Sequence, residues 1–388
     1  MMSLKARYNF LHLFYWFTVC CINGFIAVFL QYKGLSNTEI GIVSGGSCVA
    51  TIFLSPFMSS LISKIQGMTI KKLMTYILTA TFIMYLVMAY LPIPVILLMA
   101  IYIIMYALNL STVPMLTMIA MNYINEGTYI NFGLARGLGS ASWATSALIF
   151  GQVISFLDTS ILSIAYTLFS CMTLAILYTL PESQITATSH KKEGSVFTVI
   201  KKYKIFFFLL LGFCFVFSGA TALGTYLINI VKNLGGNTSL YGVCMFAMAF
   251  SELPIMMMVP RLMKKFDSVT LILVASVFYI FRNYTIGLAP NLIILIIGMM
   301  FQGLSYGLFT GVITYYVTYK LETQDQMAGQ TMIGIMTSGI GSTLGNVLGG
   351  ILQDTIGLSS LFIFVYIMTA TGAIIIFSCK IISGKIKK

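Results

Sequence analysis

The stretch NFGLARGLGSASWATSA, residues 131–147, decides how the rest of the chain is interpreted. It has a helical pattern, and it places a charge and an indole inside a chain that is otherwise strongly apolar. Arg136 and Trp143 are seven residues apart, or almost two turns, so they share one face about 10 Å apart with Ser140 between them. Small residues on this segment let a neighbouring helix come close: Gly133, Gly137, Gly139 and Ala144.

These polar groups favour a binding site. The guanidinium of Arg136 offers a planar fork of donors, and the indole of Trp143 offers a flat apolar platform. Together with the Ser140 hydroxyl they suit a polyhydroxylated or anionic molecule. The alternative is that Arg136 only marks the cytoplasmic end of a helix and extends to lipid phosphates.

Composition places the chain in a membrane. Of its 388 residues, 59% are hydrophobic and 8% charged, whereas a soluble domain carries about 25% charged residues. The net charge of +12 could indicate nucleic acid, but the basic residues lie in short loops between apolar runs, as topology signals do. The seven cysteines lie inside apolar segments without metal-ligand spacing. We therefore expect a lipid bilayer as partner, and no nucleic acid, metal or cofactor.

Apolar runs of about 20 residues span a bilayer. The sequence predicts an all-α membrane protein with twelve transmembrane helices in two pseudo-symmetric six-helix bundles. The helices are expected over residues 8–31, 38–62, 71–91, 94–122, 132–157, 160–180, 205–231, 238–263, 269–289, 291–319, 326–353 and 358–382.

The distribution of lysine and arginine supports an even number of helices. With the N-terminus inside, eighteen basic residues fall on the cytoplasmic side, and only Lys33 and Lys232 fall outside. A missed helix would move every later loop to the other side and blur this bias. We therefore expect a multi-pass protein of the plasma (inner) membrane with both termini in the cytoplasm.

Two halves are expected. Residues 183–204 read as a cytoplasmic linker, rich in Ser, Thr and Lys, between an N-terminal bundle (1–182) and a C-terminal bundle (205–388). The sequence GLGS at 137–140 recurs as GIGS at 339–342. Two parallel six-helix halves are a transporter architecture with the substrate site at the midplane between them. Gly341, Gly345 and Gly349 repeat every four residues and predict a close-packing face.

Few ionisable groups lie away from the helix ends: Arg136, Glu252 and Arg282. Such groups are costly in a bilayer and usually face a cavity or each other. Glu252 lies near the middle of its helix, where its protonation could depend on what occupies the cavity, as proton coupling requires. The alternative is a structural ion pair between Glu252 and Arg282.

Neutral polar residues lie on several further helices. Gln302 and Ser305 share a helix face, Asn23 and Asn229 lie in the first and seventh helices, and Thr117 lies in the fourth. Hydrogen-bonding groups on several helices suit a hydroxyl-rich ligand. The alternative is that each one stabilises helix packing.

The chain resembles the major facilitator superfamily over nearly its full length, and FGLARGLGSASWA resembles the oligosaccharide:proton symporter branch typified by lactose permease. The resemblance implies that Arg136 and Trp143 bind the sugar. It also places the helix 8 glutamate of that branch on Glu252, in Ser251-Glu252-Leu253, and its helix 9 arginine on Arg282.

Several positions depart from that branch. Its sugar-binding glutamate of helix 4 falls on Thr117, after Pro114, and its helix 10 histidine and proton-carrying glutamate fall on Gln302 and Ser305. Its two helix 7 aspartates fall near Thr221 and Gly224, and their lysine partners are also missing. Charge partners have therefore disappeared together, which indicates a different network and leaves Glu252 as the carboxylate for coupling.

The sequence predicts a monomeric secondary transporter that takes up a sugar or small oligosaccharide with protons. The substrate site is expected at Arg136, Trp143, Ser140, Thr117, Gln302, Asn23 and Asn229, and the coupling site at Glu252, Arg282 and Ser305. A nucleoside or an aromatic carboxylate is the alternative substrate, and a non-transporting membrane receptor the alternative class. An enzyme is not expected, because no nucleophile–base pair or metal cluster is recognisable.

Overall fold

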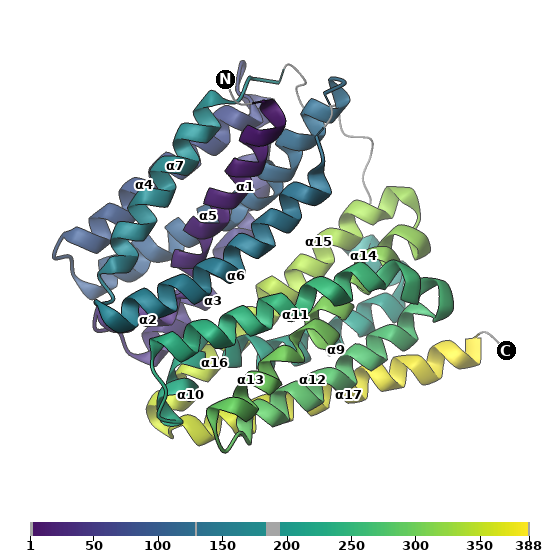
Figure 1. The fold of residues 1–388 in the computed structure, drawn as a ribbon. Coiled ribbons are helices and arrows are strands. Elements are labelled where there is room, and N and C mark those ends of the chain that lie inside the picture. The colour runs from purple at the N-terminus through teal and green to yellow at the C-terminus, as the bar shows by residue number, and fades with distance from the viewer. Residues whose placement is uncertain (1–2, 129, 184–194, 387–388) are drawn as a thin grey trace. The chain divides into compact units, whose positions relative to one another are not determined.

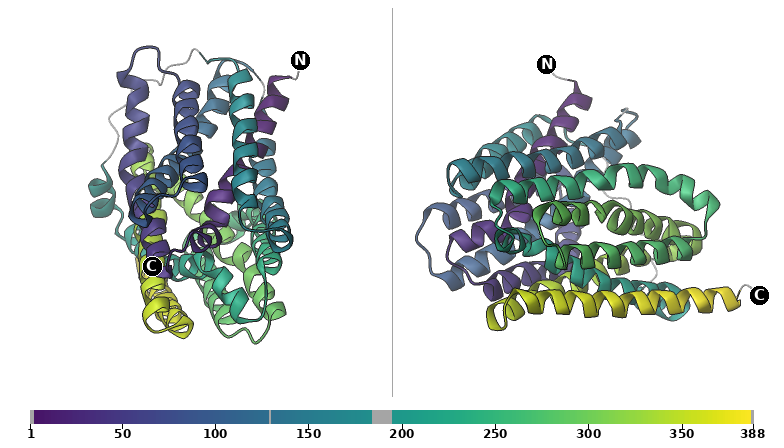
Figure 2. Two further views of the ribbon diagram at one scale, coloured as in Figure 1. Left: turned by 90° about the vertical axis from the view of Figure 1, so that its left-hand side faces the viewer. Right: turned by 60° about the horizontal axis from the view of Figure 1, so that its bottom comes forward.

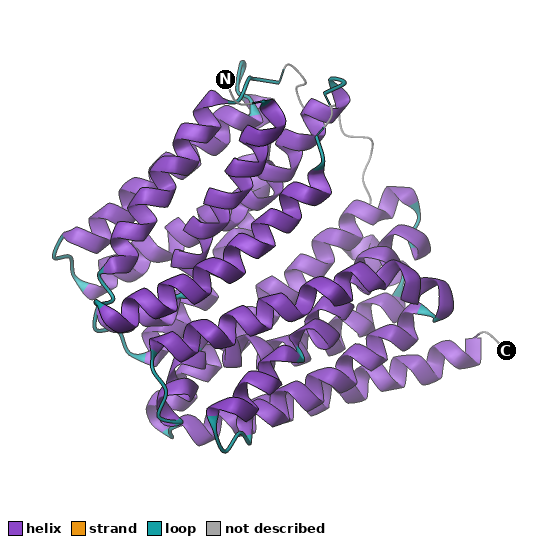
Figure 3. Ribbon diagram, in the orientation of Figure 1, coloured by secondary structure: helices purple, strands orange, loops and turns teal. Residues whose placement is uncertain are grey.

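The computed structural model describes residues 3–128, 130–183 and 195–386. Within these residues the chain forms helices joined by loops and no strand (Figure 3), so the predicted all-α membrane fold is confirmed. Ten described helices are long and apolar enough to cross a membrane, or eleven if the bent pair Leu4–Gly24 and Ile26–Tyr32 forms one span. The helix Phe132–Phe156 is outside this set, because its glycines, serines and Arg136 make it less apolar. Twelve crossings therefore stay a prediction.

The chain forms two compact units. Unit 1 contains residues 1–35 and 46–189, and unit 2 contains residues 36–45 and 190–388. The first elements, labelled in Figure 1, are α1 (Leu4–Val19), the π-helical turn η1 (Cys20–Gly24), α2 (Ile26–Tyr32), α3 (Asn37–Lys64), α4 (Ile70–Tyr90), α5 (Val95–Asn125), α6 (Phe132–Phe156) and α7 (Ile161–Thr179).

The later elements all belong to unit 2. They are α8 (Val196–Lys202), α9 (Lys204–Thr225), α10 (Leu227–Asn233), α11 (Thr238–Lys265), α12 (Ser268–Gly287), α13 (Leu292–Met300), η2 (Gly303–Gly307), α14 (Leu308–Lys320), η3 (Thr323–Asp325), α15 (Gln326–Gly334), η4 (Ile335–Gly341), α16 (Ser342–Thr355) and α17 (Leu358–Ile386). Figure 2 shows α17 as one uninterrupted helix of unit 2.

Local sequence sets where these helices begin and end. The side chains of Asn131, Asn237 and Asn291 each accept a hydrogen bond from a backbone N–H three residues later, which caps α6, α11 and α13. The short helices α2 and α10 are each followed by a glycine with positive φ, Gly34 and Gly235. Only glycine adopts this left-handed conformation without strain. The matching ends support the internal repeat of the two halves.

Two predicted helices are interrupted, and two more contain a π-helical turn. The helix expected over 8–31 bends by 57° between η1 and α2, and the one expected over 205–231 divides between α9 and α10. Those expected over 291–319 and 326–353 each contain a π-helical turn, with the sequences GLSYG and IMTSGIG. Treating the first and seventh as continuous helices was wrong, because hydropathy does not register a local break, whereas the tenth and eleventh are each one span, Leu292–Lys320 and Thr323–Thr355. Such turns are frequent at functional sites.

The predicted glycine face of the eleventh helix is confirmed. A Cβ at Gly345 would lie 2.1 Å from the carbonyl oxygen of Ser218 on α9, and one at Gly341 would lie 3.0 Å from that of Cys214. At Gly349 the nearest atoms would lie 3.1 Å away, on Leu361 and Tyr226. The absence of side chains lets α16 and η4 approach the α9 backbone, which is how helices gain packing energy in a bilayer.

Gly345→Ala is therefore expected to destabilise unit 2 by about 1–3 kcal/mol, the usual cost of overpacking. The new methyl group meets backbone, which cannot rotate away. Thermal unfolding of the purified protein measures the effect. The matched control is Gly224→Ala on α9, where a Cβ would meet nothing within 4 Å. Equal unfolding temperatures for the two variants would contradict this packing.

Helix α3 belongs to both units, because its first nine residues pack in unit 2. The carboxylate of Asp354, at the end of α16, accepts hydrogen bonds from the backbone N–H groups of Asn37 at 3.3 Å and Thr38 at 2.6 Å. It also accepts one from the Asn37 side-chain amide at 2.9 Å. A carboxylate here satisfies the unpaired N–H groups of a helix start and its positive dipole end. Tyr226 donates to the carbonyl of Asn37 at 3.0 Å.

The predicted linker, residues 183–204, lies partly outside the described residues, which resume at Ser195 with α8. At the end of α8, Lys202 forms ion pairs with Glu322 at 2.6 Å and Asp325 at 2.9 Å. These two carboxylates raise the pKa of Lys202 above its ordinary value. Tyr203 also donates to Asp325 at 3.0 Å. The last part of the predicted linker is therefore fixed to unit 2.

Candidate functional site

Arg136 lies in a polar cluster between α6 and α1 of unit 1. Its Nη1 donates to the hydroxyl of Ser140 at 3.2 Å, so two residues predicted to share a face do meet. Its guanidinium carbon lies 4.8 Å from the centre of the Trp16 ring on α1. A cation over an indole face is held by the ring quadrupole. The exposed guanidinium therefore lies beside an aromatic surface, an arrangement that suits a polar ligand.

The aromatic platform beside Arg136 comes from α1. Trp143, the indole that the spacing on α6 favoured, is half-buried and packs against the hydrophobic core of unit 1. A substrate-binding role for Trp143 stays a prediction. Trp16 reaches Arg136 because Gly139 has no side chain: a Cβ there would lie 2.4 Å from Trp16 Cδ1. Spacing within one helix could not identify a partner on another.

Gly139→Ala is expected to displace the Trp16 ring and weaken substrate binding by about tenfold, equivalent to about 1.4 kcal/mol. The nearest atoms to the added methyl group belong to a rigid indole. Gly137→Ala is the matched control on the same helix, because a Cβ there meets nothing within 4 Å. The measurement is the affinity of both variants for a transported ligand. Equal affinity would mean that the position of Trp16 is irrelevant to binding.

The other two predicted residues of unit 1 lie on different elements. Thr117 is half-buried on α5, and Asn23 is exposed in the π-helical turn η1. Their substrate contacts stay predictions. The sequence interpretation missed His12, which is 1% exposed on α1. The available signal was its spacing from Trp16, since residues four apart share a helix face.

In unit 2 the structure brings Glu252 and Gln302 together. Gln302 Nε2 donates to Glu252 Oε1 at 3.1 Å. The N–H of the next residue, Gly303, donates at 3.0 Å to the Oγ of Ser251, the residue before Glu252. A Cβ at Gly303 would lie 2.0 Å from the Ser251 carbonyl oxygen. The turn η2 can therefore approach α11 closely enough to place an amide beside the membrane carboxylate.

Arg282 is 1% exposed on α12. Its Nη1 donates to the side chain of Asn283 at 2.9 Å, and its Nε has no hydrogen-bond partner among the described residues. Asn283 in turn donates to Thr369 on α17 at 2.7 Å. The Glu252 carboxylate acts on Arg282 electrostatically. A buried cation that hydrogen-bonds to a neutral amide depends on such a charge for compensation.

Two other predicted residues of unit 2 hydrogen-bond within the protein. Ser305 is fully buried, and its hydroxyl donates to the Phe301 carbonyl at 2.9 Å. Asn229 on α10 donates to the side chains of Asn37 at 2.8 Å and Gln353 at 3.0 Å. Their roles in coupling and substrate binding stay predictions.

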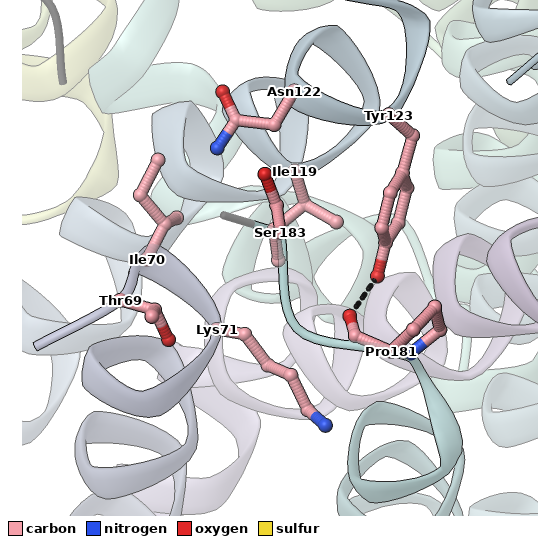
Figure 4. A pocket seen from close by; sticks show the side chains of 8 residues that line it. All are labelled: Thr69, Ile70, Lys71, Ile119, Asn122, Tyr123, Pro181 and Ser183. Atoms are coloured by element: carbon pink, nitrogen blue, oxygen red, sulfur yellow. Dashed lines mark hydrogen bonds between the residues drawn. The ribbon is translucent and has the colours of Figure 1, made fainter. Parts of the chain in front are cut away.

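A separate small cavity of about 10 Å³ lies where α4 begins and α5 ends in unit 1 (Figure 4). This volume holds about one water molecule. Tyr123 on its wall donates to the Pro181 carbonyl. The cavity belongs to the contact that holds the segment after α7, and it is too small for a substrate.

The helical fold and the charges at Arg136, Glu252 and Arg282 are typical of a membrane transporter of the major facilitator type, and comparisons with known proteins agree. The model of the MFS_1 like family matches residues 5–364. The maltose permease of Geobacillus stearothermophilus is 22% identical over 270 residues, which cover 70% of this chain and 68% of that protein. The chain belongs to the MFS_1 like family.

Solved structures share the fold. A mutant of the nucleoside transporter NupG superimposes with a TM-score of 0.83 at 14% identity, covering 97% of this chain and 99% of that one. The D-xylose-proton symporter superimposes with a TM-score of 0.69 at 14% identity, covering 97% and 96%. These relatives are transporters, and this protein is a multi-pass membrane transporter rather than an enzyme.

Proposed function

We propose that the protein takes up a sugar or small oligosaccharide together with protons. The observation that carries the proposal is the arrangement of Arg136, which lies over the Trp16 ring and is hydrogen-bonded to Ser140. Sugar hydroxyls are bound by planar donor forks, and the apolar faces of sugar rings pack on aromatic rings. The similarity to a maltose permease supports a carbohydrate substrate.

Transport proceeds by alternating access, in which two six-helix halves (1–182 and 205–388, joined by 183–204) rock about the substrate. The protein acts as a monomer in the plasma (inner) membrane with both termini in the cytoplasm. The sharing of α3 between the two compact units supports this mechanism.

Glu252 carries the coupling proton. Protonation removes its negative charge beside Gln302 and weakens its attraction for Arg282, so the state of the carboxyl group changes the energy of the unit 2 network. Ser305, at the position of the proton-carrying glutamate in lactose-permease-like symporters, holds the backbone of η2 in place.

Nucleoside uptake is the second candidate. The observation that favours it is that a nucleoside transporter is among the solved structures that share the fold over nearly the whole chain. A ribose offers hydroxyls to Arg136, and a base offers a ring to Trp16. An aromatic carboxylate would pair its anion with Arg136.

Thermal unfolding of the purified protein tests these substrates. Maltose, D-xylose, uridine and phenylacetate are added separately, and a true ligand at 100 times its dissociation constant adds about 2.7 kcal/mol of stability. The stabilising ligand is then tested for uptake into proteoliposomes with and without an imposed pH gradient, with a protonophore as control. Stabilisation by uridine alone would replace the sugar proposal, and uptake indifferent to the pH gradient would overturn the coupling.

A further inference from the structure

Two ring nitrogens on α1 lie unpaired beside Arg136. His12 Nδ1 and Trp16 Nε1 are buried and have no hydrogen-bond partner among the described residues. Both face the same point of α6: a Cβ on Gly139 would lie 2.6 Å from Trp16 Nε1 and 3.3 Å from His12 Nδ1. Residues four apart on a helix share a face, so the two nitrogens flank one location.

The hydrogen bonds of Tyr8 assign the hydrogen on His12. The Tyr8 hydroxyl donates to the carbonyl of Leu116 on α5 at 2.8 Å. A phenol has a single hydrogen, so its oxygen can only accept in its 3.0 Å contact with His12 Nε2. Nε2 therefore carries the hydrogen of the neutral ring, and Nδ1 has a free lone pair.

The positive charge of Arg136 favours the neutral form of the His12 ring. Its guanidinium lies over the Trp16 ring at 4.8 Å, and a protonated His12 would add a second cation to the same cluster, where like charges repel. The indole Nε1–H can only donate. The pair therefore consists of one acceptor, His12 Nδ1, and one donor, Trp16 Nε1.

We propose that His12 Nδ1 and Trp16 Nε1 together bind one hydroxyl group of the substrate, which donates to His12 and accepts from Trp16. Burying polar atoms without partners costs free energy, and a hydroxyl is the smallest ligand group that satisfies an acceptor and a donor at once. The inference rests on the proposed uptake of a hydroxylated substrate and specifies one subsite for a sugar or a nucleoside ribose. Tyr8 is the positioning residue, because it fixes which nitrogen of His12 accepts.

Two substitutions separate the nitrogens of His12. His12→Asn places an amide oxygen near the Nδ1 position and retains an acceptor, whereas His12→Gln can retain a donor to Tyr8 and loses that acceptor. Affinities are measured for maltose and its monodeoxy analogues, and for uridine and its 2′-, 3′- and 5′-deoxy analogues. His12→Gln is expected to weaken binding of the parent ligand by about tenfold, and His12→Asn by less than about threefold.

A thermodynamic cycle that combines the His12 substitution with each deoxy ligand identifies the hydroxyl group that His12 binds. One deoxy analogue is expected to bind the wild type about tenfold more weakly than its parent, yet to bind His12→Gln as well as the parent does, because the two changes remove one interaction. Strictly additive losses for every analogue would overturn the proposal. Unchanged ligand affinities of His12→Gln with a lowered unfolding temperature would also overturn it. That result would mean that a water molecule, and not the substrate, bridges His12 Nδ1 and Trp16 Nε1.

A ligand-free measurement keeps the inference separate from the proposed function. The chain has two histidines, and His190 lies outside the described residues, so His190→Gln leaves one imidazole for ¹⁵N NMR. The expected spectrum has a protonated Nε2 and an unprotonated Nδ1. A hydrogen on Nδ1 would overturn the inference whatever the substrate. If neither maltose, D-xylose nor uridine binds the wild type, the proposed function and the hydroxyl subsite both fail, while the tautomer is decided by this spectrum.

Discussion

Arg136→Lys is expected to weaken substrate binding almost as much as Arg136→Ala, by about tenfold to a hundredfold, because hydrogen bonds to a charged group contribute about 1.5–3 kcal/mol. The guanidinium stacks on Trp16 and donates to Ser140 at the same time. Lysine offers a point charge on a flexible stem, so it keeps the charge and loses the planar fork of donors. The measurement is ligand affinity from thermal unfolding and from uptake.

Arg261→Lys is the matched control for Arg136→Lys. Arg261 is exposed near the end of α11, so the same exchange there should change neither affinity nor unfolding temperature. Full affinity of Arg136→Lys would show that Arg136 serves only as a cation that extends to lipid phosphates.

Glu252→Gln is expected to abolish uphill accumulation driven by a pH gradient and to leave exchange of substrate across the membrane. Glutamine imitates the protonated carboxyl group permanently, so the charge that acts on Arg282 is always absent. Exchange does not need the proton to cycle. Two proteoliposome assays measure the effect, one with an imposed pH gradient and one with equal substrate on both sides.

Glu182→Gln controls for the loss of a carboxylate. Glu182 forms an exposed ion pair with Lys72 at 3.3 Å, and such surface pairs contribute little. Wild-type accumulation by Glu252→Gln would remove the coupling role and leave a structural contact with Gln302 and Arg282. Loss of both accumulation and exchange, with intact folding, would make Glu252 a direct substrate ligand.

The fold was readable from the sequence because each bilayer-spanning helix satisfies its own backbone groups and needs a long apolar run. The helix from Ile70 to Tyr90 was expected over 71–91, and the one from Leu358 to Ile386 over 358–382. The breaks in the first and seventh helices and the π-helical turns in the tenth and eleventh were not predictable. Hydropathy averages over about 19 residues, and a single wide turn does not change that average.

The candidate site was readable only in part. The meeting of Arg136 with Ser140 follows from a spacing of four residues on α6. The contacts of Arg136 with Trp16 and of Glu252 with Gln302 each join two helices. A single sequence does not show which helices are neighbours, so it contains no signal for such pairs. In the structure, Gly139 and Gly303 allow the two helices of each pair to approach closely.

By itself, the sequence determined that the chain is helical, lies in a membrane and carries isolated charges at Arg136, Glu252 and Arg282. These properties depend on composition and on spacing within one helix, which the chain encodes locally. Tertiary structure alone decided that Trp16 lies beside Arg136, that His12 presents Nδ1 as an acceptor, and that Asp354 caps the start of α3 from 316 residues away. The physical reason is that a hydrogen bond or a stacked ring depends on distances of a few ångströms between helices, and only packing sets those distances.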